Sequence, residues 1–371
     1  MLFRSTRKAF CRSEGQAPTA RRVVRVPLGR ATGPDARPRI VSKNNQPRRG
    51  ASGEAVRDLH RRLLELGYPV EETEVVEGSF GRDTEARLRA FQAERGLHEH
   101  GRLDTTTMAA LVEAGYRLGD RNLYLHSPMM RGDDVADLQL RLGGLGFDAG
   151  RIDGVFGPDS ARALLDFQRN TGLATDGIAG HHTLVSLRQL AARHSGRTPV
   201  AQVRELERLR QAQARLVDRR VALGQFGSCA ALAGAVARQL RARGAQVISL
   251  DHPDEEHQAR TANGFDAELY LGLHLERDSS SRIQYFSTEG FQSEGGLRLA
   301  RRCATALGNS LAGSYEIQGM RLPILRATRM PAVLCSLGPP SRVVRATGYI
   351  AETLAGAVAA WVDDPVSLPE G

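Results

Sequence analysis

An internal repeat is the feature of this sequence that most limits its fold. Eleven positions of one stretch recur 76 residues later with the same or a closely similar side chain, as Gly78 and Phe91 do at Gly154 and Phe167. Five positions upstream recur at an offset of 79, so the first unit carries three extra residues after Gly67. Self-similarity over this length predicts two copies of one small module.

Each unit has the pattern of three short helices. In the second unit, Val135, Leu138 and Leu142 are spaced three and four apart, which places them on one helical face. Ser160 precedes the next apolar helical pattern at a position suited to an N-cap, and a third helix begins near Thr183. We therefore predict two all-α modules of three helices each.

The shared motifs are V-x2-L-x3-L-x2-LG, DG-x-FG, FQ, GL and DG-x2-G-x2-T-x3-L. This pattern resembles the peptidoglycan-binding repeat of bacterial cell-wall proteins. The first unit departs from it at Glu77, and at His100 where the second unit has Asp176. Most shared positions are glycines, leucines and caps that build the module, so they do not identify ligand contacts. The resemblance implies binding to glycan strands or to protein partners.

The later part of the chain alternates strand and helix patterns. Apolar runs at 246–250, 269–274 and 332–334 are separated by helical stretches. This alternation predicts an α/β domain with a mixed sheet and helices on both faces. A charged stretch with Val203 and Leu206 on one face predicts a linker helix in front of this domain.

The predicted protein is therefore multidomain. Its expected parts are a disordered basic tail (1–52), repeat one (53–115), a linker (116–131), repeat two (132–190), a linker helix (191–216), an α/β domain (217–363) and a short tail (364–371).

Three segments of the α/β domain carry a second resemblance. The segments RTAN at 260–263, GLH at 272–274 and LRATRMPAVL at 325–334 resemble R-x-AN, SIH-AN and LR-x-T-x-MPAVLVE of the zinc-dependent N-acetylmuramoyl-L-alanine amidases. The resemblance implies an amidase-like fold for residues 217–363.

The same resemblance implies a catalytic set of His, Glu and His holding zinc, plus a separate catalytic Glu. Where the family has a DPGHGG loop with the first His, this chain has GQFG at 224–227. Gln225 is among the residues near the position of the ligand Glu, the second His is present as His274, and Ser336 replaces the catalytic Glu. With one of four positions left, we predict a pseudoenzyme. His274 and Ser336 would be vestigial, and no catalytic, metal or cofactor site is expected.

Other chemistry is not indicated. Cys335 neighbours Ser336 in a predicted strand, so its side chain is expected on the opposite face. His252 and His257 lie in an acidic loop typical of a solvated surface, and His274 fits a hydrogen-bonded histidine at the sheet edge. Ser336 lacks the G-x-S-x-G setting of a serine nucleophile.

The net positive charge of the chain comes from its first 50 residues. The first 50 residues hold 13 of the 51 Lys and Arg and 2 of the 42 Asp and Glu, a net charge of +11 that leaves −2 for the rest. Such a tail can bind nucleic acid or anionic lipid. Its only aromatic residues are Phe3 and Phe10, so base stacking and a nucleic-acid partner are not expected.

The expected location is the cytoplasm. No apolar run approaches the roughly 20 residues of a transmembrane helix, so no transmembrane segment is expected. The N-terminus also lacks the apolar core of a secretory signal.

The combination of two repeats with a degenerate amidase domain resembles an actinobacterial group of amidase-like regulators. The segments at 113–119 and 326–331 are the most similar to that group. The resemblance implies a non-catalytic regulator that binds a peptidoglycan-precursor enzyme, in particular the UDP-N-acetylglucosamine enolpyruvyl transferase. The alternatives are a peptidoglycan-binding cell-wall protein and an N-acetylmuramoyl-L-alanine amidase that cleaves the muramoyl-peptide amide bond.

Overall fold

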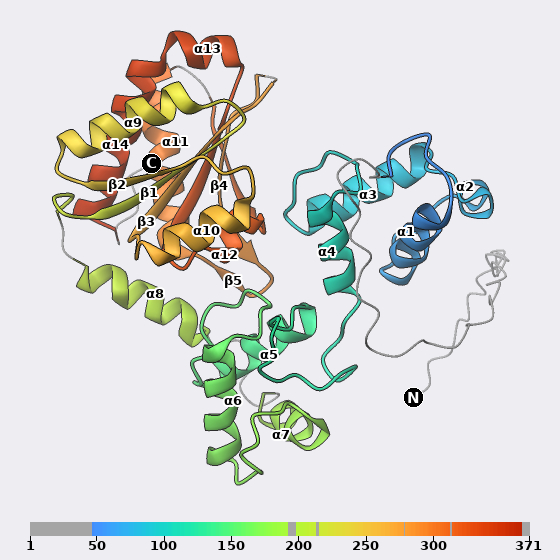
Figure 1. Ribbon diagram of the computed structural model, residues 1–371. Helices are drawn as coiled ribbons and strands as arrows, with labels where there is room; N and C mark the ends of the chain where they lie inside the picture. The colour runs from blue at the N-terminus through green and yellow to red at the C-terminus, as the bar shows by residue number, and fades with distance from the viewer. Residues whose placement is uncertain (1–46, 192–197, 213–214, 278, 312–313, 366–371) are drawn as a thin grey trace, which may run out of the picture. The chain divides into compact units, whose positions relative to one another are not determined.

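The computed structural model describes residues 47–191, 198–212, 215–277, 279–311 and 314–365 (Figure 1). All of them belong to one compact unit, Val41–Gly371. Most of the predicted basic tail and the last six residues lie outside the described residues.

Repeat one contains the three predicted helices and one more. The helices are α1 (Glu54–Glu65), α2 (Glu72–Glu77), α3 (Arg82–Glu94) and α4 (Thr105–Ala114). The short α2 occupies the loop that carries the three extra residues. Its Glu74 accepts hydrogen bonds from the backbone N–H groups of Gly81, Asp83 and Thr84, and so satisfies the free donors at the start of α3. The insertion thus supplies a helix cap.

Repeat two has the three predicted helices, α5 (Asp133–Gly144), α6 (Pro158–Asn170) and α7 (His181–Ala191). The predicted N-cap at Ser160 is wrong, because α6 begins after Gly157 with Pro158 at its first position. Proline is favoured there since its missing N–H would have had no partner. The Ser160 hydroxyl instead donates to the carbonyl of Ala149 in the preceding loop.

The α/β domain is built on a seven-stranded sheet with the order β2-β1-β3-β7-β4-β5, in which β6 also pairs with β4. Its strands are β1 (Arg220–Phe226), β2 (Gln246–Leu250), β3 (Leu269–Leu275), β4 (Arg282–Thr288), β5 (Phe291–Gln292), β6 (Glu316–Met320) and β7 (Ala332–Leu337). Strands β2, β1, β3 and β7 are parallel, and β4 runs antiparallel to β7. The predicted mixed sheet is confirmed.

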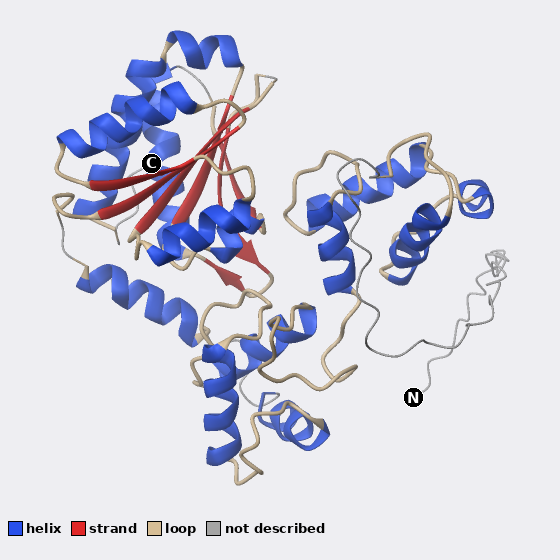
Figure 2. Cartoon of the chain, in the orientation of Figure 1, coloured by secondary structure: helices blue, strands red, loops and turns tan. Residues whose placement is uncertain are grey.

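Helices cover both faces of this sheet, as predicted (Figure 2). The first face packs against α9 (Ala230–Ala242), α11 (Glu294–Leu311) and α14 (Thr347–Asp363), and the second against α10 (Glu255–Gly264) and α12 (Pro323–Ala327). Alternate residues of a strand enter the two cores, as Val333 and Leu334 of β7 do.

The remaining helices are α8 (Val200–Gln211), which packs on α11, and α13 (Pro340–Arg345), which precedes α14. Among the residues that the structure describes, no helix combines the length and apolar character needed to cross a bilayer.

Candidate functional site

The parallel strands bring together His274 and Ser336, the two residues that the sequence predicted to be vestigial. His274 lies near the end of β3, where it is in register with Ser336 of β7 on one side and Phe226 of β1 on the other. The ends of parallel strands in an α/β sheet are the usual place for a ligand site. The sheet edge formed by β1, β3 and β7 is therefore the first candidate site.

Ser336 and its neighbour Cys335 are both neutral groups with partners of their own. The fully buried Ser336 hydroxyl donates a hydrogen bond to Oε1 of Gln284 on β4, at 3.0 Å. Cys335 points into the opposite core, as predicted, where hydrogen bonding to Cys303 and burial raise the pKa of its thiol well above the ordinary value. A thiol held protonated in this way is a poor metal ligand.

His274 lies at the sheet edge as expected, but within the described residues its Nδ1 does not form the hydrogen bond that the sequence predicted. Its Nδ1 is buried without a hydrogen-bond partner among the described residues, and Oε1 of Glu276 is 3.8 Å away. Burial lowers the pKa of His274. The imidazole of His98 from repeat one lies nearby, with 6.3 Å between the ring centroids. Burial, and then His274, lower the pKa of His98 to about 4.

The residues at this edge do not fit the zinc site that the amidase resemblance implies. Gln225 uses its Oε1 to accept the N–H of Cys229 at the start of α9. A Cβ on Gly224 would lie 1.8 Å from the hydroxyl of Tyr270, which itself donates to Gln258. Within the described ranges, no group of three or more His, Cys, Asp or Glu side chains is arranged to hold a metal.

The other histidines considered from the sequence lie elsewhere. His252 and His257 are both exposed, and their rings stack on each other with centroids 4.0 Å apart. Asp254 caps α10 beside them through its bonds to the N–H groups of Glu256 and His257. This loop is the solvated surface that the sequence predicted.

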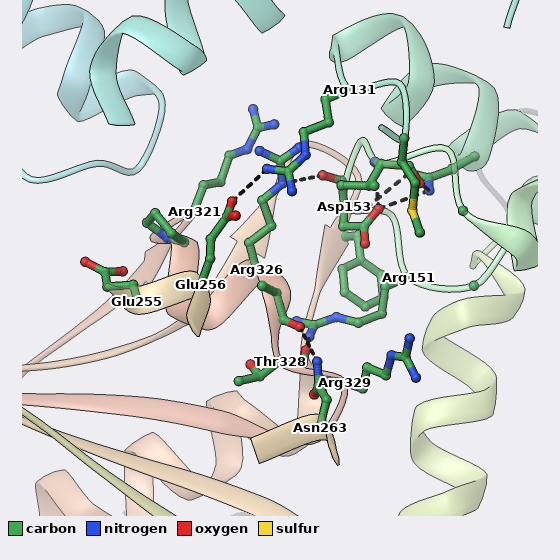
Figure 3. Close-up of a pocket in the computed structure, with 18 of the residues that line it drawn as sticks. Arg131, Arg151, Asp153, Glu255, Glu256, Asn263, Arg321, Arg326, Thr328 and Arg329 are labelled. Carbon is green, nitrogen blue, oxygen red and sulfur yellow. Dashed lines mark hydrogen bonds and ion pairs between the residues drawn. The ribbon is translucent and has the colours of Figure 1, made fainter. Parts of the chain in front are cut away.

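A cavity of about 1300 Å³ forms the second candidate site (Figure 3). Residues of repeat one, repeat two, α8 and the α/β domain all line it. Its lining includes many charged side chains of both signs: Arg95, Glu113, Arg131, Asp133, Asp148, Arg151, Asp153, Asp159, Arg204, Glu205, Arg208, Asp254, Glu255, Glu256, Arg260, Arg321, Arg326 and Arg329. Sequence reasoning did not predict this site, because its residues come from separate parts of the chain.

Arg326 connects three parts of the chain at this cavity. Its Nε donates to the carbonyl of Asp153 in repeat two at 2.6 Å, and its Nη1 donates to Glu113 of repeat one at 2.8 Å. Both partners in the ion pair are almost fully buried, with side chains 14% and 9% exposed. The two segments that most resemble the regulator group therefore meet through this pair.

Arg151 makes the reverse connection, from repeat two into the α/β domain. It donates to the carbonyls of Thr328 and Leu325, and its guanidinium lies over the ring of Phe286 at 4.3 Å from the centroid. Desolvation lowers the pKa of this guanidinium.

The segment that receives Arg151 is fixed from the other side by α10. Asn263 donates through Nδ2 to the carbonyl of Ala327 at 2.8 Å and accepts the N–H of Arg329 at 2.9 Å. Two hydrogen bonds thus join the R-x-AN motif to the LR-x-T-x-MP motif. Arg131, the residue directly before repeat two, also pairs with Glu256 of α10, at 2.7 Å.

The paired motif glutamines of the repeats have a structural role. Gln168 is buried, donates to Asp176, Ile178 and Thr183, and accepts the N–H of Gly177. Gln92 makes the corresponding bonds in repeat one. These residues hold the loop before the last helix and do not point to a ligand.

Comparisons with known proteins match the two repeats to a family model and find amidases among the relatives of the chain. The family model described as a putative peptidoglycan binding domain matches residues 52–111 and 131–187. The N-acetylmuramoyl-L-alanine amidase CwlM of Mycobacterium tuberculosis is 34% identical over 298 residues, which cover 70% of this chain and 71% of that protein. The amidase CwlL of Bacillus licheniformis is 31% identical over 38% of this chain and 45% of its own.

Among solved structures, an N-acetylmuramoyl-L-alanine amidase from Clostridium difficile is similar to 40% of this chain over 98% of its own length. The TM-score is 0.33 and the identity is 15%.

Proposed function

The chain belongs to the N-acetylmuramoyl-L-alanine amidase family, and from that premise we propose that it is a non-catalytic regulator of peptidoglycan biosynthesis. In this proposal the protein acts by binding other proteins, and the amidase-like domain does not break bonds.

The observation that carries the proposal is the chemistry of the sheet edge. Zinc hydrolysis needs three side-chain ligands and an open position for water. His274 is the single family ligand retained, and the neighbouring positions hold Ser336 and Gln225, whose polar groups are engaged with Gln284 and with the N–H of Cys229. The neutral amide of Gln225 cannot replace an ionised carboxylate ligand, and the hydroxyl of Ser336 cannot act as the general base that the catalytic Glu would supply.

The connection between the domains also supports a docking role. Arg151 and Arg326 join the segment at 325–328 to both repeats, so this segment is engaged in contacts within the chain. An assembly held in this way can present one composite surface to a partner.

The partner that we propose is the UDP-N-acetylglucosamine enolpyruvyl transferase, encountered in the cytoplasm. The support for this partner is the sequence resemblance to the regulator group. The test is to measure kcat/KM of the transferase from the same organism with and without the full chain, together with reciprocal pull-down from fractionated cells. An unchanged kcat/KM, with the tagged chain recovered only from the wall fraction, would refute this partner.

The loss of catalysis is tested separately. We expect the purified chain to contain no stoichiometric zinc and to leave muramoyl-peptide amide bonds intact when zinc is supplied. A family amidase with a complete ligand set serves as the positive control on the same substrate. Amide cleavage that a chelator abolishes would show that the pseudoenzyme proposal is wrong.

A second candidate function is binding to peptidoglycan itself, which the family match of both repeats favours. Its test is sedimentation of the full chain with purified sacculi. Saturable binding that survives high salt would support it, because purely electrostatic adsorption weakens as salt screens exposed charges.

A further inference from the structure

The cavity contains a group of arginines with more positive charge than its ion pairs neutralise. We call Arg95, Arg131, Arg321 and Arg326 the arginine cluster. Its carboxylate partners are Asp133, which is shared by two of the arginines, Glu113 and Glu256. Four guanidinium groups therefore share three ion-paired carboxylates, so Arg95 and Arg321 have only Asp133 between them.

Two members of the cluster have unused hydrogen-bonding capacity. Arg321 contacts Asp133 at 3.6 Å, whereas Arg95 holds the same carboxylate at 2.6 Å. Nη2 of Arg326 is buried and has no hydrogen-bond partner among the described residues. A buried donor without a partner costs free energy, so the site favours an additional acceptor.

The electrostatic setting of Arg321 agrees with this geometry. Burial, and then the charge of Arg326, lower the pKa of the Arg321 guanidinium. Figure 3 shows Arg131, Arg321 and Arg326 directed into the same region of the cavity. An anion placed there would be close to several guanidinium groups at once.

Two other carboxylates of the cavity are held by groups outside the arginine cluster. Asp148 pairs with Arg204 of α8. Glu205 accepts the N–H groups of Glu294 and Gly295 at the start of α11.

We propose that the arginine cluster binds an organic anion with two closely spaced negative charges, carried on phosphate or carboxylate groups. Guanidinium groups bind both kinds of oxyanion in a bidentate manner. The cavity, at about 1300 Å³, is large enough for the rest of a metabolite-sized molecule. This inference goes beyond the proposed regulatory function and does not depend on it.

Because the cluster draws its arginines from repeat one, from the residue directly before repeat two and from the α/β domain, the bound anion would touch all three parts. Ligand binding would then stabilise the docked arrangement of the chain, since a ligand that binds only the assembled site shifts the equilibrium toward it. The site would couple the concentration of a small anion to the docked arrangement of the repeats on the α/β domain.

The test is calorimetric titration of the full chain with inorganic pyrophosphate and, in a separate arm, with glutarate. We expect at least one of the two to bind, and Arg321→Met to weaken binding by about tenfold, which corresponds to about 1.4 kcal/mol. Binding of pyrophosphate alone identifies a phosphate ligand, and binding of glutarate alone a carboxylate ligand. Arg131→Met, which removes a more exposed member of the cluster, provides a second variant if the first does not fold.

The matched control is Arg162→Met, which removes an exposed arginine of α6 outside the cluster. It should bind like the original chain. If neither anion binds, or if Arg162→Met loses as much affinity as Arg321→Met, the cavity holds only water or attracts anions without a specific site, and the proposal is wrong.

Discussion

The contact between repeat one and the α/β domain can be tested with two equivalent glycines. Gly96 and Gly172 occupy the same position in the two repeats and have similar left-handed φ values, +60° and +71°. A Cβ on Gly96 would lie 3.1 Å from the backbone nitrogen of Arg321 and 3.2 Å from Cα of Met320, whereas a Cβ on Gly172 meets nothing within 4 Å. The second glycine therefore provides an internal reference for the first.

The expected cost of each substitution follows from this difference. Replacement by alanine places a side chain in the left-handed region, which costs about 1–2 kcal/mol at either position. At Gly96 the new methyl group also presses on the backbone of the neighbouring domain, and such overpacking adds about 1–3 kcal/mol. Because only Gly96→Ala adds this overpacking, we expect it to lower the free energy of unfolding by about 1–3 kcal/mol more than Gly172→Ala does.

The assay is urea unfolding of both variants combined with hydrogen exchange. The N–H of Arg321 donates to the carbonyl of Gly96 at 2.7 Å, so its exchange reports directly on this contact. We expect faster exchange at Arg321 in Gly96→Ala and unchanged exchange in Gly172→Ala. Equal destabilisation by the two substitutions, with Arg321 equally protected in both, would refute the reasoning that repeat one rests on this backbone.

Three further predictions follow from buried groups. Arg326→Met should lower the free energy of unfolding by about 3–5 kcal/mol, because it leaves the carboxylate of Glu113 buried and unpaired. Adding Glu113→Gln should recover part of the loss, and strict additivity of the two substitutions would contradict a direct ion pair. The pKa of His98 is lowered to about 4, below its value in an unfolded chain, so the contribution of neutral His98 to stability is present above about pH 6.5 and is lost as the pH falls toward 4. NMR titration of the His98 ring should give a midpoint near 4, and a midpoint near 6.5 would contradict its burial. Gln168→Ala should cost about 1–3 kcal/mol in urea unfolding, because it leaves the N–H of Gly177 and other loop groups without their partner, and a loss no larger than that of an exposed surface substitution would show that the loop does not depend on it.

The elements that the sequence predicted well are those with a local periodic signal. The helices of repeat two, and strands such as β2 and β3, follow from the spacing of apolar residues. The short strands β5 and β6 and the short helix α12 were not predicted. They contain two to five residues each, too few for a periodicity, and they form because β4 and the neighbouring helices provide partners.

Some features of the candidate site could also be read from the sequence, and others could not. The residue types at the amidase motif positions, such as Gln225 and Ser336, could be read from the sequence, and the absence of a zinc site there stays a prediction. The fate of the His274 ring nitrogen could not be predicted, since its neighbours His98 and Glu276 reach it only in the folded chain.

The amino-acid sequence by itself determined the repeated helical modules and the α/β domain, because each is encoded in the local spacing of apolar residues. Only the tertiary structure decided that Arg326 meets Glu113, 213 residues away in the chain, and that the arginine cluster lines one cavity. The physical reason is that a buried charge requires a partner, but the residues around it in the sequence do not specify which distant segment will supply that partner.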